Sequence, residues 1–258
     1  MIRLERQQDR SLAAQLFTGI SIWRALVHSA ARTRFGHLVV DDRRNPTVGV
    51  LFYGGNVIYA GNAESEAAGE IVRAFPVQPA ILGHSPAWNR LIEQTFGDQL
   101  RTARRYQLPA ESLDLSVTRE KLAGRDEVWR PIARDDLEHV ERDLGWEHHK
   151  YHYESPEDFL RRGNGFVITD QGRTAAGASS FVDSDTHVEC QITTAPAFRR
   201  KGYGALVAAA YIERCHATGK TVPWDAAHEA SVRLARSLGY RAVHEYTVYE
   251  LFPRDLGS

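Results

Sequence analysis

The stretch Thr186–Thr218 reads THVECQITTAPAFRRKGYGALVAAAYIERCHAT and joins two contrasting patterns. In its first part, Val188–Thr194, apolar and polar residues alternate and β-branched side chains are frequent, which predicts a strand. In its last part, Ala205–His216, helix formers follow one another without Gly or Pro, and Gly219 stands where a C-terminal cap belongs. The stretch therefore predicts a strand, a loop and a helix in direct succession.

The loop between this strand and this helix combines glycines with positive charge. It contains Arg199, Arg200, Lys201, Gly202, Tyr203 and Gly204. The two glycines let the backbone approach a ligand closely, and the N–H groups at the start of a helix carry a partial positive charge. With three cationic side chains in the same turn, we predict an anion site that suits a pyrophosphate. The alternative is a tight turn with a solvated basic tip.

The composition indicates a globular protein of one large domain or two ordinary ones, with 258 residues, 43% hydrophobic and 25% charged. The formal net charge of −1 disfavours nucleic acid and anionic membranes as partners. Cys190 and Cys215 fall inside predicted elements and suit buried free thiols in a reducing cytoplasm. No segment reaches the ~18 apolar residues of a membrane span, and the first residues lack a signal-peptide core. We expect a soluble cytoplasmic protein, and the sequence leaves a homodimer open.

The first half predicts mixed α and β structure without a phosphate loop. Val48–Tyr53 and Val57–Gly61 form a predicted hairpin around Gly54-Gly55, which joins two strands and is followed by no helix. Val77–Leu82 predicts a further strand, and Ser85-Pro86 supplies the cap and first-turn proline of a helix.

The polar segment Ser116–Arg125 interrupts the apolar pattern and predicts a domain boundary. We expect an N-terminal α/β domain over residues 1–120 and a second domain over residues 121–258. From Val128 the predicted order is β-α-α-β-β-β-α-β-α-β-β, ending in a strand pair over Tyr240–Leu251. The whole chain is then an α+β protein with mixed αβα layering.

A second informative block, Trp224–Tyr240, reads WDAAHEASVRLARSLGY. One face of its predicted helix carries Ser231, Leu234, Ala235 and Leu238. With the Arg-x-x-Gly-x-Gly loop, this block resembles the GCN5-related N-acetyltransferases (GNAT). More narrowly, the pattern over about Gly165–Tyr240 resembles the bacterial subfamily that includes the zwittermicin-resistance acetyltransferases. Members of that subfamily carry an extra N-terminal half, often regarded as a degenerate GNAT-like fold.

The resemblance implies a GNAT acyl-CoA N-acyltransferase fold in the second half, with acetyl-CoA (CoA) as donor. The coenzyme-binding residues it implies are Ile192, Thr193, Thr194, Arg199, Arg200, Lys201, Gly202, Tyr203, Gly204, Ala205, His228 and Ser231. Ile192–Thr194 would run beside the pantetheine and supply a backbone N–H to the thioester oxygen; the alternative is an ordinary paired strand. Two positions depart from the family pattern, since His228 stands for the usual Asn and Ala235 for the Tyr that protonates the leaving thiolate. Three tyrosines are untested candidates to replace that acid, and the sequence favours none of them: Tyr203, Tyr211 and Tyr240.

Acetyl transfer to an amine needs a free lone pair. A lysine-like amine is neutral at pH 7 in only about one molecule in 2,500, which corresponds to roughly 4.6 kcal/mol. A carboxylate is therefore the expected base, and the resemblance favours Glu189 on the central strand. The alternative for Glu189 is a structural ion pair or a solvent-facing position.

The segment Trp146–Tyr153, WEHHKYHY, is rich in aromatic residues and histidine. Similar enzymes border the acceptor pocket with the loop between the first two helices, so the resemblance implies substrate contacts at Trp146, Tyr151 and Tyr153. A metal site would have to be drawn from His148, His149, His152 and Glu154. The stretch lacks cysteine and helical or hairpin support, and we expect no metal there.

Together these patterns predict an acetyl-CoA-dependent N-acetyltransferase that acylates a small amine directly within a ternary complex. No cysteine lies where a covalent acyl-enzyme would be natural. The alternative is a non-catalytic CoA-binding module with a protein partner, which His228 and Ala235 favour. O-acyl transfer and a longer acyl donor also stay open. A dinucleotide oxidoreductase is disfavoured, because Gly-x-Gly-x-x-Gly is absent at the strand-helix turn.

Overall fold

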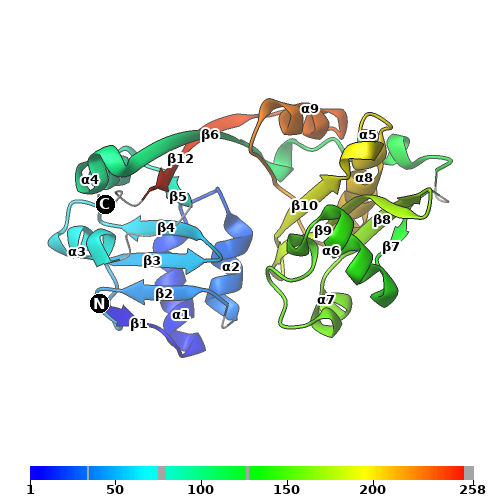
Figure 1. Cartoon of the computed structure of the whole chain (residues 1–258). Coiled ribbons are helices and arrows are strands. Elements are labelled where there is room, and N and C mark those ends of the chain that lie inside the picture. The colour runs from blue at the N-terminus through cyan, green and yellow to red at the C-terminus, as the bar shows by residue number, and fades with distance from the viewer. Residues whose placement is uncertain (34, 75–79, 126–127, 253–258) are drawn as a thin grey trace, which may run out of the picture. The chain divides into compact units, whose positions relative to one another are not determined.

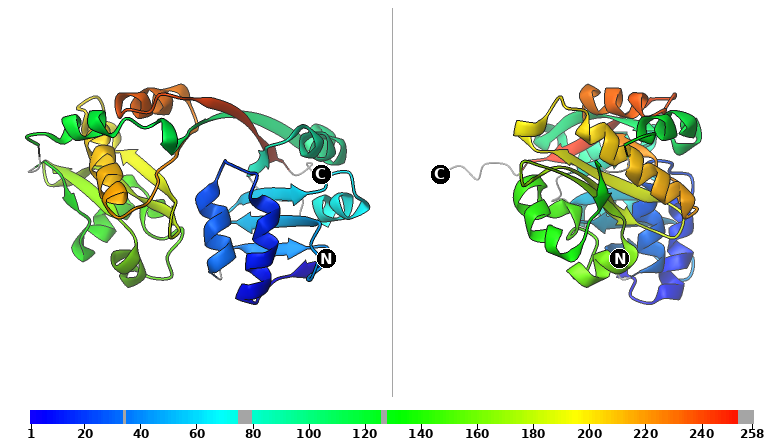
Figure 2. Two further views of the ribbon diagram at one scale, coloured as in Figure 1. Left: turned by 180° about the vertical axis from the view of Figure 1, so that it is seen from behind. Right: turned by 90° about the vertical axis from the view of Figure 1, so that its right-hand side faces the viewer.

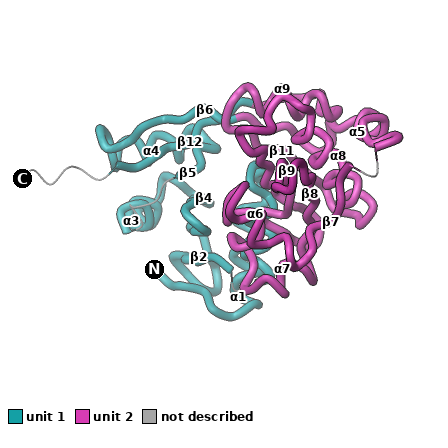
Figure 3. Tube along the Cα trace, turned by 45° about the vertical axis from the view of Figure 1, so that its right-hand side comes forward, with its two compact units in different colours: residues 1–105, 245–258 teal, residues 106–244 magenta. Residues whose placement is uncertain are grey.

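A computed structural model describes the chain except for residues 34, 75–79, 126–127 and 253–258. It is a mixed α+β protein, as predicted, and it divides into two compact units (Figure 3). Unit 1 comprises residues 1–105 and 245–258, and unit 2 comprises residues 106–244. The two units meet after Arg105 and after His244, and not at residue 120. A domain boundary at residue 120 stays a prediction.

Unit 1 is a twisted sheet with helices on both faces (Figures 1 and 2). Its strands, in spatial order, are β1 (Ile2–Arg3), β2 (His37–Val40), β3 (Val48–Tyr53), β4 (Asn56–Gly61), β5 (Ala80–Gly83) and β12 (His244–Leu251), followed by the beginning of β6 (Leu100–Leu108). Helices α1 (Gln7–Ala13) and α2 (Arg24–Arg32) cover one face, and α3 (Glu66–Ala74) and α4 (Pro86–Phe96) cover the other. The predicted hairpin and the Ser85-capped helix are confirmed as β3–β4 and α4.

Unit 2 contains the stretch Thr186–Thr218. Its elements are α5 (Leu115–Leu122), β7 (Arg130–Pro131), α6 (Leu137–Leu144), α7 (Pro156–Arg162), β8 (Gly165–Asp170), β9 (Arg173–Asp183), β10 (Val188–Thr194), α8 (Tyr203–Ala217), β11 (Trp224–Ala226) and α9 (Glu229–Ser237). An antiparallel sheet runs in the order β10-β9-β8-β7. Helices α6 and α7 lie on one face of this sheet and α8 on the other (Figures 1 and 2).

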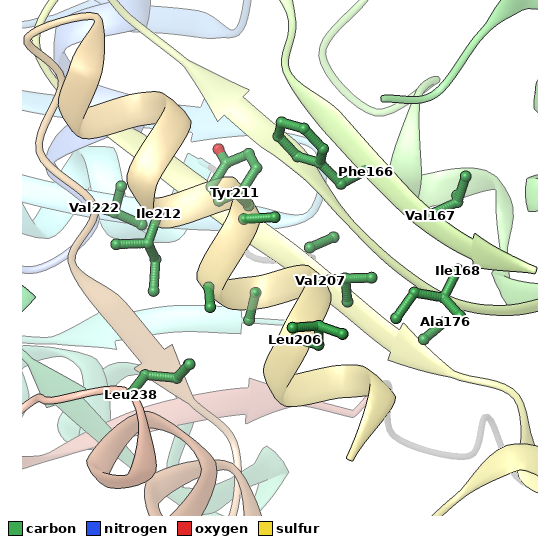
Figure 4. Close-up of a cluster of buried hydrophobic side chains, with 14 of the residues drawn as sticks. Phe166, Val167, Ile168, Ala176, Leu206, Val207, Tyr211, Ile212, Val222 and Leu238 are labelled. Atoms are coloured by element: carbon green, nitrogen blue, oxygen red, sulfur yellow. The ribbon is translucent and has the colours of Figure 1, made fainter. Parts of the chain in front are cut away.

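The core of unit 2 forms where α8 packs on this sheet. Leu206 and Val207 of α8 lie toward Ile168 and Ala176 of the strands, whereas Ile212 lies on another side of the helix (Figure 4). All five side chains are buried. Burial of apolar surface contributes a stabilising free energy of ~25 cal/mol per Å² removed from water. The packing therefore holds α8 against the strands that border the loop.

The strands of unit 2 separate beside β10. His187 and Thr221 form an isolated parallel bridge just before β10 and β11. Beyond that bridge β11 pairs with the end of β6, through Trp224 with Leu108 and Ala226 with Tyr106, and not with β10. Within the described chain, β10 therefore has a strand partner, β9, on one side alone. Its other edge presents backbone groups that another extended chain could pair with.

Three sequence expectations differ from the structure in detail. The polar segment from Ser116 continues helix α5, and the expected pair of final strands is one strand, β12. Strand β12 pairs with β5, through Thr247 with Gly83 and Val248 with Leu82, so most of this strand belongs to unit 1. The expected strand over 77–82 is β5, of which residues 77–79 lie outside the described residues.

Candidate functional site

The loop between β10 and α8 contains two residues in the left-handed backbone region. The φ angle is +67° at Arg200 and +81° at Gly202. A left-handed backbone is uncommon for a residue with a side chain, and such conformations concentrate at functional sites. Turns of this kind gather successive backbone N–H groups into concavities that bind anions.

Helix α8 begins with its amide groups available. Gly202 is the N-cap, and no side chain of the described residues caps this end of the helix. A Cβ on Gly202 would meet no atom within 4 Å, whereas a Cβ on Gly204 would lie 2.8 Å from Oγ1 of Thr194. Gly202 therefore leaves open space in front of the helix dipole, and Gly204 lets the helix approach the end of β10.

The three cations of the loop have different surroundings. Lys201 Nζ lies 2.8 Å from Asp170 Oδ2 at the β8–β9 turn, and the Tyr203 hydroxyl donates to the same oxygen at 2.9 Å. Arg199 Nε lies 3.5 Å from the Thr194 carbonyl, and Arg200 is exposed without an ion pair to any described residue. The Lys201 ammonium also lowers the pKa of the Asp170 carboxyl. The two arginines are thus the side chains left to meet an anion.

The end of β10 is fixed on both faces of its sheet. The side chain of Thr194 contacts the first turn of α8 next to Gly204. Thr193 points to the opposite face, where its Oγ1 lies 3.0 Å from Nε2 of His148. Ile192–Thr194 are half-buried and lie at the open edge, beside the turn between β10 and α8. The predicted coenzyme residues of this strand and loop are therefore neighbours in space.

Glu189 lies near the start of β10 and is 8% exposed. Its register partner is Val182, and the register shifts between Glu189 and Cys190, so that Phe181 is the extra residue of a β-bulge. Bulges of this kind redirect side chains next to active sites. A carboxylate with so little exposure is a candidate for chemistry rather than for solvation alone.

An aromatic surface borders the bulge. Phe181 stacks on Tyr151 with ring centroids 3.8 Å apart, and Trp146 lies 6.4 Å from Tyr151 and is 48% exposed. Tyr153, in contrast, is 6% exposed and packs edge-on against Phe159 in the core. Of the three predicted acceptor contacts, Trp146 and Tyr151 offer a surface to a ligand, and Tyr153 offers little.

The histidines of the same loop have separate surroundings. His148 is bound between two hydroxyl groups, His149 lies beside Phe159 at 6.2 Å, and His152 meets the edge of Tyr153 at 5.4 Å. Burial lowers the pKa of His148 to about 3 and of His152 to about 4, so both rings are neutral at pH 7. Within the described ranges, no group of three or more His, Cys, Asp or Glu side chains could hold a metal.

Helix α9 carries the second predicted block. His228 is its N-cap, and its Nδ1 accepts a hydrogen bond from the backbone N–H of Ser231 at 3.2 Å. Trp224 Nε1 donates to the Ser231 hydroxyl at 3.0 Å, and Trp224 is buried. The imidazole at the position of the usual Asn therefore caps the helix and stays exposed on its other side.

The three tyrosines that could replace the missing acid are engaged elsewhere. Tyr211 and Tyr240 are 0% and 1% exposed in the core, and Tyr203 donates to Asp170. Both cysteines are free, and burial raises the pKa of the Cys190 thiol well above its ordinary value. No reactive thiolate is formed on β10 at neutral pH.

Three residues of this site escaped the sequence reasoning: Asp170, Phe181 and His148 in its bridging position. Asp170 and Phe181 reach the site through the pairing of β8, β9 and β10, which spacing alone does not reveal. The run of small residues over 175–180, AAGASS, is the one available signal, because it leaves room for a bulky side chain packed on that strand.

Two features of unit 2 agree with the resemblance of the sequence to the GNAT acetyltransferases. One is an open strand edge, and the other is an uncapped helix that begins with a left-handed, cationic turn. A family profile described as GNAT acetyltransferase matches residues 14–249. The chain therefore belongs to the GNAT acetyltransferase family, as its motifs predict. Among the described residues, no helix is long and apolar enough to cross a membrane.

Solved structures and a curated relative agree with this assignment. A GCN5-related N-acetyltransferase-like protein from Streptococcus suis 89/1591 has a TM-score of 0.78 and 25% identity, covering 95% of this chain and 98% of that one. A GCN5-related N-acetyltransferase from Kribbella flavida has a TM-score of 0.58 at 14% identity, over 93% and 95% of the two chains, and shares the fold. The uncharacterized N-acetyltransferase YdfB of Bacillus subtilis (strain 168) is 23% identical over 171 residues, which are 66% of this chain and 64% of that protein. The match thus spans slightly less than two thirds of that relative.

Proposed function

We propose that this protein transfers an acetyl group from acetyl-CoA directly to the amine of a small molecule. The observation that carries the proposal is the open edge of β10 next to the uncapped start of α8. An extended pantetheine arm fits the first feature and a diphosphate fits the second. Because both features lie in unit 2, the proposal needs no residue of unit 1.

The coenzyme would bind through backbone groups first and side chains second. The N–H groups around Gly202 and Gly204 would hold the diphosphate, with Arg199 and Arg200 supplying charge. The open edge at Ile192–Thr194 would pair with the pantetheine amides. Lys201, Tyr203 and Ala205 would line the first turn of α8, and His228 and Ser231 would approach from the start of α9. When bound, acetyl-CoA supplies the activated acetyl group as a thioester.

Glu189 would act as the base that removes the proton of the incoming ammonium. Glu189 lies on β10 opposite the bulge of β9, upstream of Ile192–Thr194 on the same strand. A backbone N–H of that segment would donate to the thioester oxygen as negative charge grows there. These two groups share one short strand, so their separation is set by the backbone of β10 and does not depend on a mobile loop.

Departure of the thiolate needs less help. A thiol with a pKa near about 8.5 leaves as a tolerable anion at neutral pH. This chain has Ala235 in place of the usual acid, and Tyr203, Tyr211 and Tyr240 are held elsewhere, so water is the proton source we propose. The high thiol pKa of Cys190 agrees with direct transfer to the amine, without an acyl-cysteine.

The acceptor would lie against the aromatic surface of Trp146, Tyr151 and Phe181. Aromatic faces attract an ammonium group by about 0.5–2 kcal/mol, and Glu189 adds a negative charge at the same end of β10. Both features suit a small cationic amine. Within the family, we propose membership of the subfamily that includes the zwittermicin-resistance acetyltransferases, in a cytoplasmic enzyme without nucleic-acid or membrane partners.

A non-catalytic CoA-binding module is the second candidate. It is favoured by the absence of a tyrosine acid and by the engagement of His228 in a helix cap. The two functions separate in one experiment, in which thiol release from acetyl-CoA is followed with a panel of small amines. Release that depends on an amine supports the enzyme, whereas tight CoA binding without release from any acceptor supports the module. A protein that binds no CoA at all contradicts both.

Substitution Glu189→Gln tests the base. We expect the rate at pH 7 to fall about 100-fold or more, since general bases contribute factors of about 10²–10⁴. The remaining rate should rise with pH, because only amine that is already neutral can react. The measurement is the pH profile of thiol release, with Glu213→Gln on the exposed side of α8 as control. An unchanged profile would remove Glu189 from this role.

A further inference from the structure

His148 is an enclosed histidine that joins three elements of unit 2. It ends the 3₁₀ turn Trp146–His148 that follows α6, and its exposed fraction is 0%. Its Nδ1 lies 2.8 Å from the hydroxyl of Ser179 on β9, and its Nε2 lies 3.0 Å from the hydroxyl of Thr193 on β10. One ring therefore ties the loop to two neighbouring strands.

The strands provide a fitted position for this ring. Gly177 is the register partner of Thr193, and Ser179 lies two residues further on the same face of β9. A Cβ on Gly177 would come 2.7 Å from Leu144 Cδ1 and 3.6 Å from His148 Cε1. The bare backbone at Gly177 thus admits α6 and the imidazole, while hydroxyl groups meet both ring nitrogens.

The ring is neutral, which fixes what it can do. Burial, and then His149, lower the pKa of His148 to about 3, so His148 is not a base at neutral pH. A neutral imidazole has one donor and one acceptor, and a hydroxyl group can take either complementary role. Both contacts of His148 are therefore satisfied at once, and the ring holds its neighbours without exchanging a proton.

We propose that His148 is a positioning residue for acyl transfer, which fixes Thr193 and thereby the open edge of β10. This edge has β9 as its partner on one side, so its other restraints are side chains. Thr194 is held against α8 and Thr193 against His148, on opposite faces. The inference rests on the proposed function, which assigns this edge to the pantetheine and the thioester.

Two substitutions separate positioning from the filling of space. The amide of His148→Asn replaces Nδ1 and keeps the contact to Ser179, whereas the amide of His148→Gln reaches the place of Nε2 and keeps the contact to Thr193. The two measurements are the affinity of each variant for CoA by calorimetry and the rate of hydrogen exchange of the backbone amides at 192–194. We expect Asn to weaken binding about tenfold and to accelerate exchange, since one hydrogen bond to the strand is lost. Gln should stay within about threefold of the wild type in both measurements.

Ser180→Ala is the matched control. It removes a buried hydroxyl contact, 3.1 Å from the Tyr211 hydroxyl, on the other face of the same strand. It should change neither measurement by more than about twofold, because it does not touch Thr193. Changes of similar size in Ser180→Ala would make the effect a general loss of packing and would overturn the inference.

Equal behaviour of the Asn and Gln variants would also overturn it, whether both bind normally or both fail. If the wild type itself binds no CoA, the proposed function fails separately. Exchange at 192–194 then still decides the role of His148: faster exchange in Asn alone supports its hold on Thr193, and equal exchange in both variants refutes it.

Discussion

Each unit contains a turn from a strand into a helix. The two turns differ in whether a side chain caps the N–H groups at the helix start and in the charge of the neighbouring residues. In unit 1, between β4 and α3, the Ser65 hydroxyl accepts from the N–H of Ala68 at 3.2 Å, and Glu64 and Glu66 lie beside the helix start. In unit 2, between β10 and α8, the N-cap is Gly202 and the neighbouring side chains are cations. The two turns therefore differ in capping and in charge, the two features that favour an anion at the start of a helix.

The strand edges beside these turns also differ, because one has a hydrogen-bonding partner and the other is open. In unit 1, β5 pairs with Asn56 and Val57 of β4, and further along His84 Nε2 donates to the carbonyl of Tyr59 at 2.6 Å. Burial lowers the pKa of His84, which keeps the ring neutral. In unit 2 the corresponding part of β10 has no such partner among the described residues. In unit 1 a side chain of the unit itself thus occupies this part of the strand edge, whereas the edge of β10 in unit 2 stays open among the described residues.

The largest effect should come from Gly202→Glu. The new carboxylate would lie in the open space before α8, where it repels a diphosphate, and like charges brought together cost several kcal/mol. We expect CoA affinity, measured by calorimetry, to fall more than about 100-fold while the fold persists.

Gly219→Glu is the matched control for this experiment. Gly219 follows the other end of α8 with φ +77°, and a Cβ there also meets nothing within 4 Å. Both variants carry the same charge and a similar backbone strain, so they should lose similar stability. Equal loss of CoA binding in the two would contradict the placement of the diphosphate.

A smaller effect is expected for Arg200→Gly, which separates the backbone of the turn from its charge. Glycine accepts φ +67° readily, so the turn keeps its form, and stability should change by less than about 1 kcal/mol. Without the guanidinium, CoA affinity should fall about tenfold and depend less on salt. The measurement is the dissociation constant over a range of ionic strength. Unchanged affinity would mean that the left-handed Arg200 serves the turn alone.

Much of this contrast could be predicted from local sequence. The alternation of Val188–Thr194, the helix formers after Gly204 and the cations between them lie within one short stretch, and the structure has β10, the turn and α8 there. Local propensity and pairing agree in this stretch, which is why the pattern was sufficient. The same holds for the hairpin around Gly54-Gly55.

Long-range pairing could not be predicted in this way. The final strand β12 leaves unit 2 at His244 and pairs with β5, more than a hundred residues earlier in the chain. Its apolar pattern is compatible with either unit, because period-2 alternation specifies a buried face and not a partner. The roles of Phe181 and Asp170 depend on the strand register in the same way, and so does the position of His148.

A modest gain in affinity is expected for Asp170→Asn. Asp170 accepts from Lys201 and Tyr203, so it holds one cation of the turn on the β8–β9 side and adds a negative charge near the site. Its removal should tighten CoA binding about threefold at low salt, and less at high salt, since the pair is exposed and screened. Weaker binding would show instead that Asp170 holds Lys201 in the productive place.

The smallest effect is expected when the turn before α3 in unit 1 is given positive charge like that of the turn before α8. We expect no second CoA site to form. In Glu64→Arg with Glu66→Lys, the turn before α3 becomes cationic, yet Ser65 still caps the helix and His84 still binds the Tyr59 carbonyl. Calorimetry should therefore give the same number of CoA sites per chain as in the wild type. A second site in this variant would show that charge alone makes such a turn a coenzyme site. A third substitution in the same variant, Ser65→Gly, removes the cap and frees the amides of α3, while His84 still occupies the strand edge. A second CoA site that appears only in this triple variant would show that capping decides whether the turn binds the coenzyme.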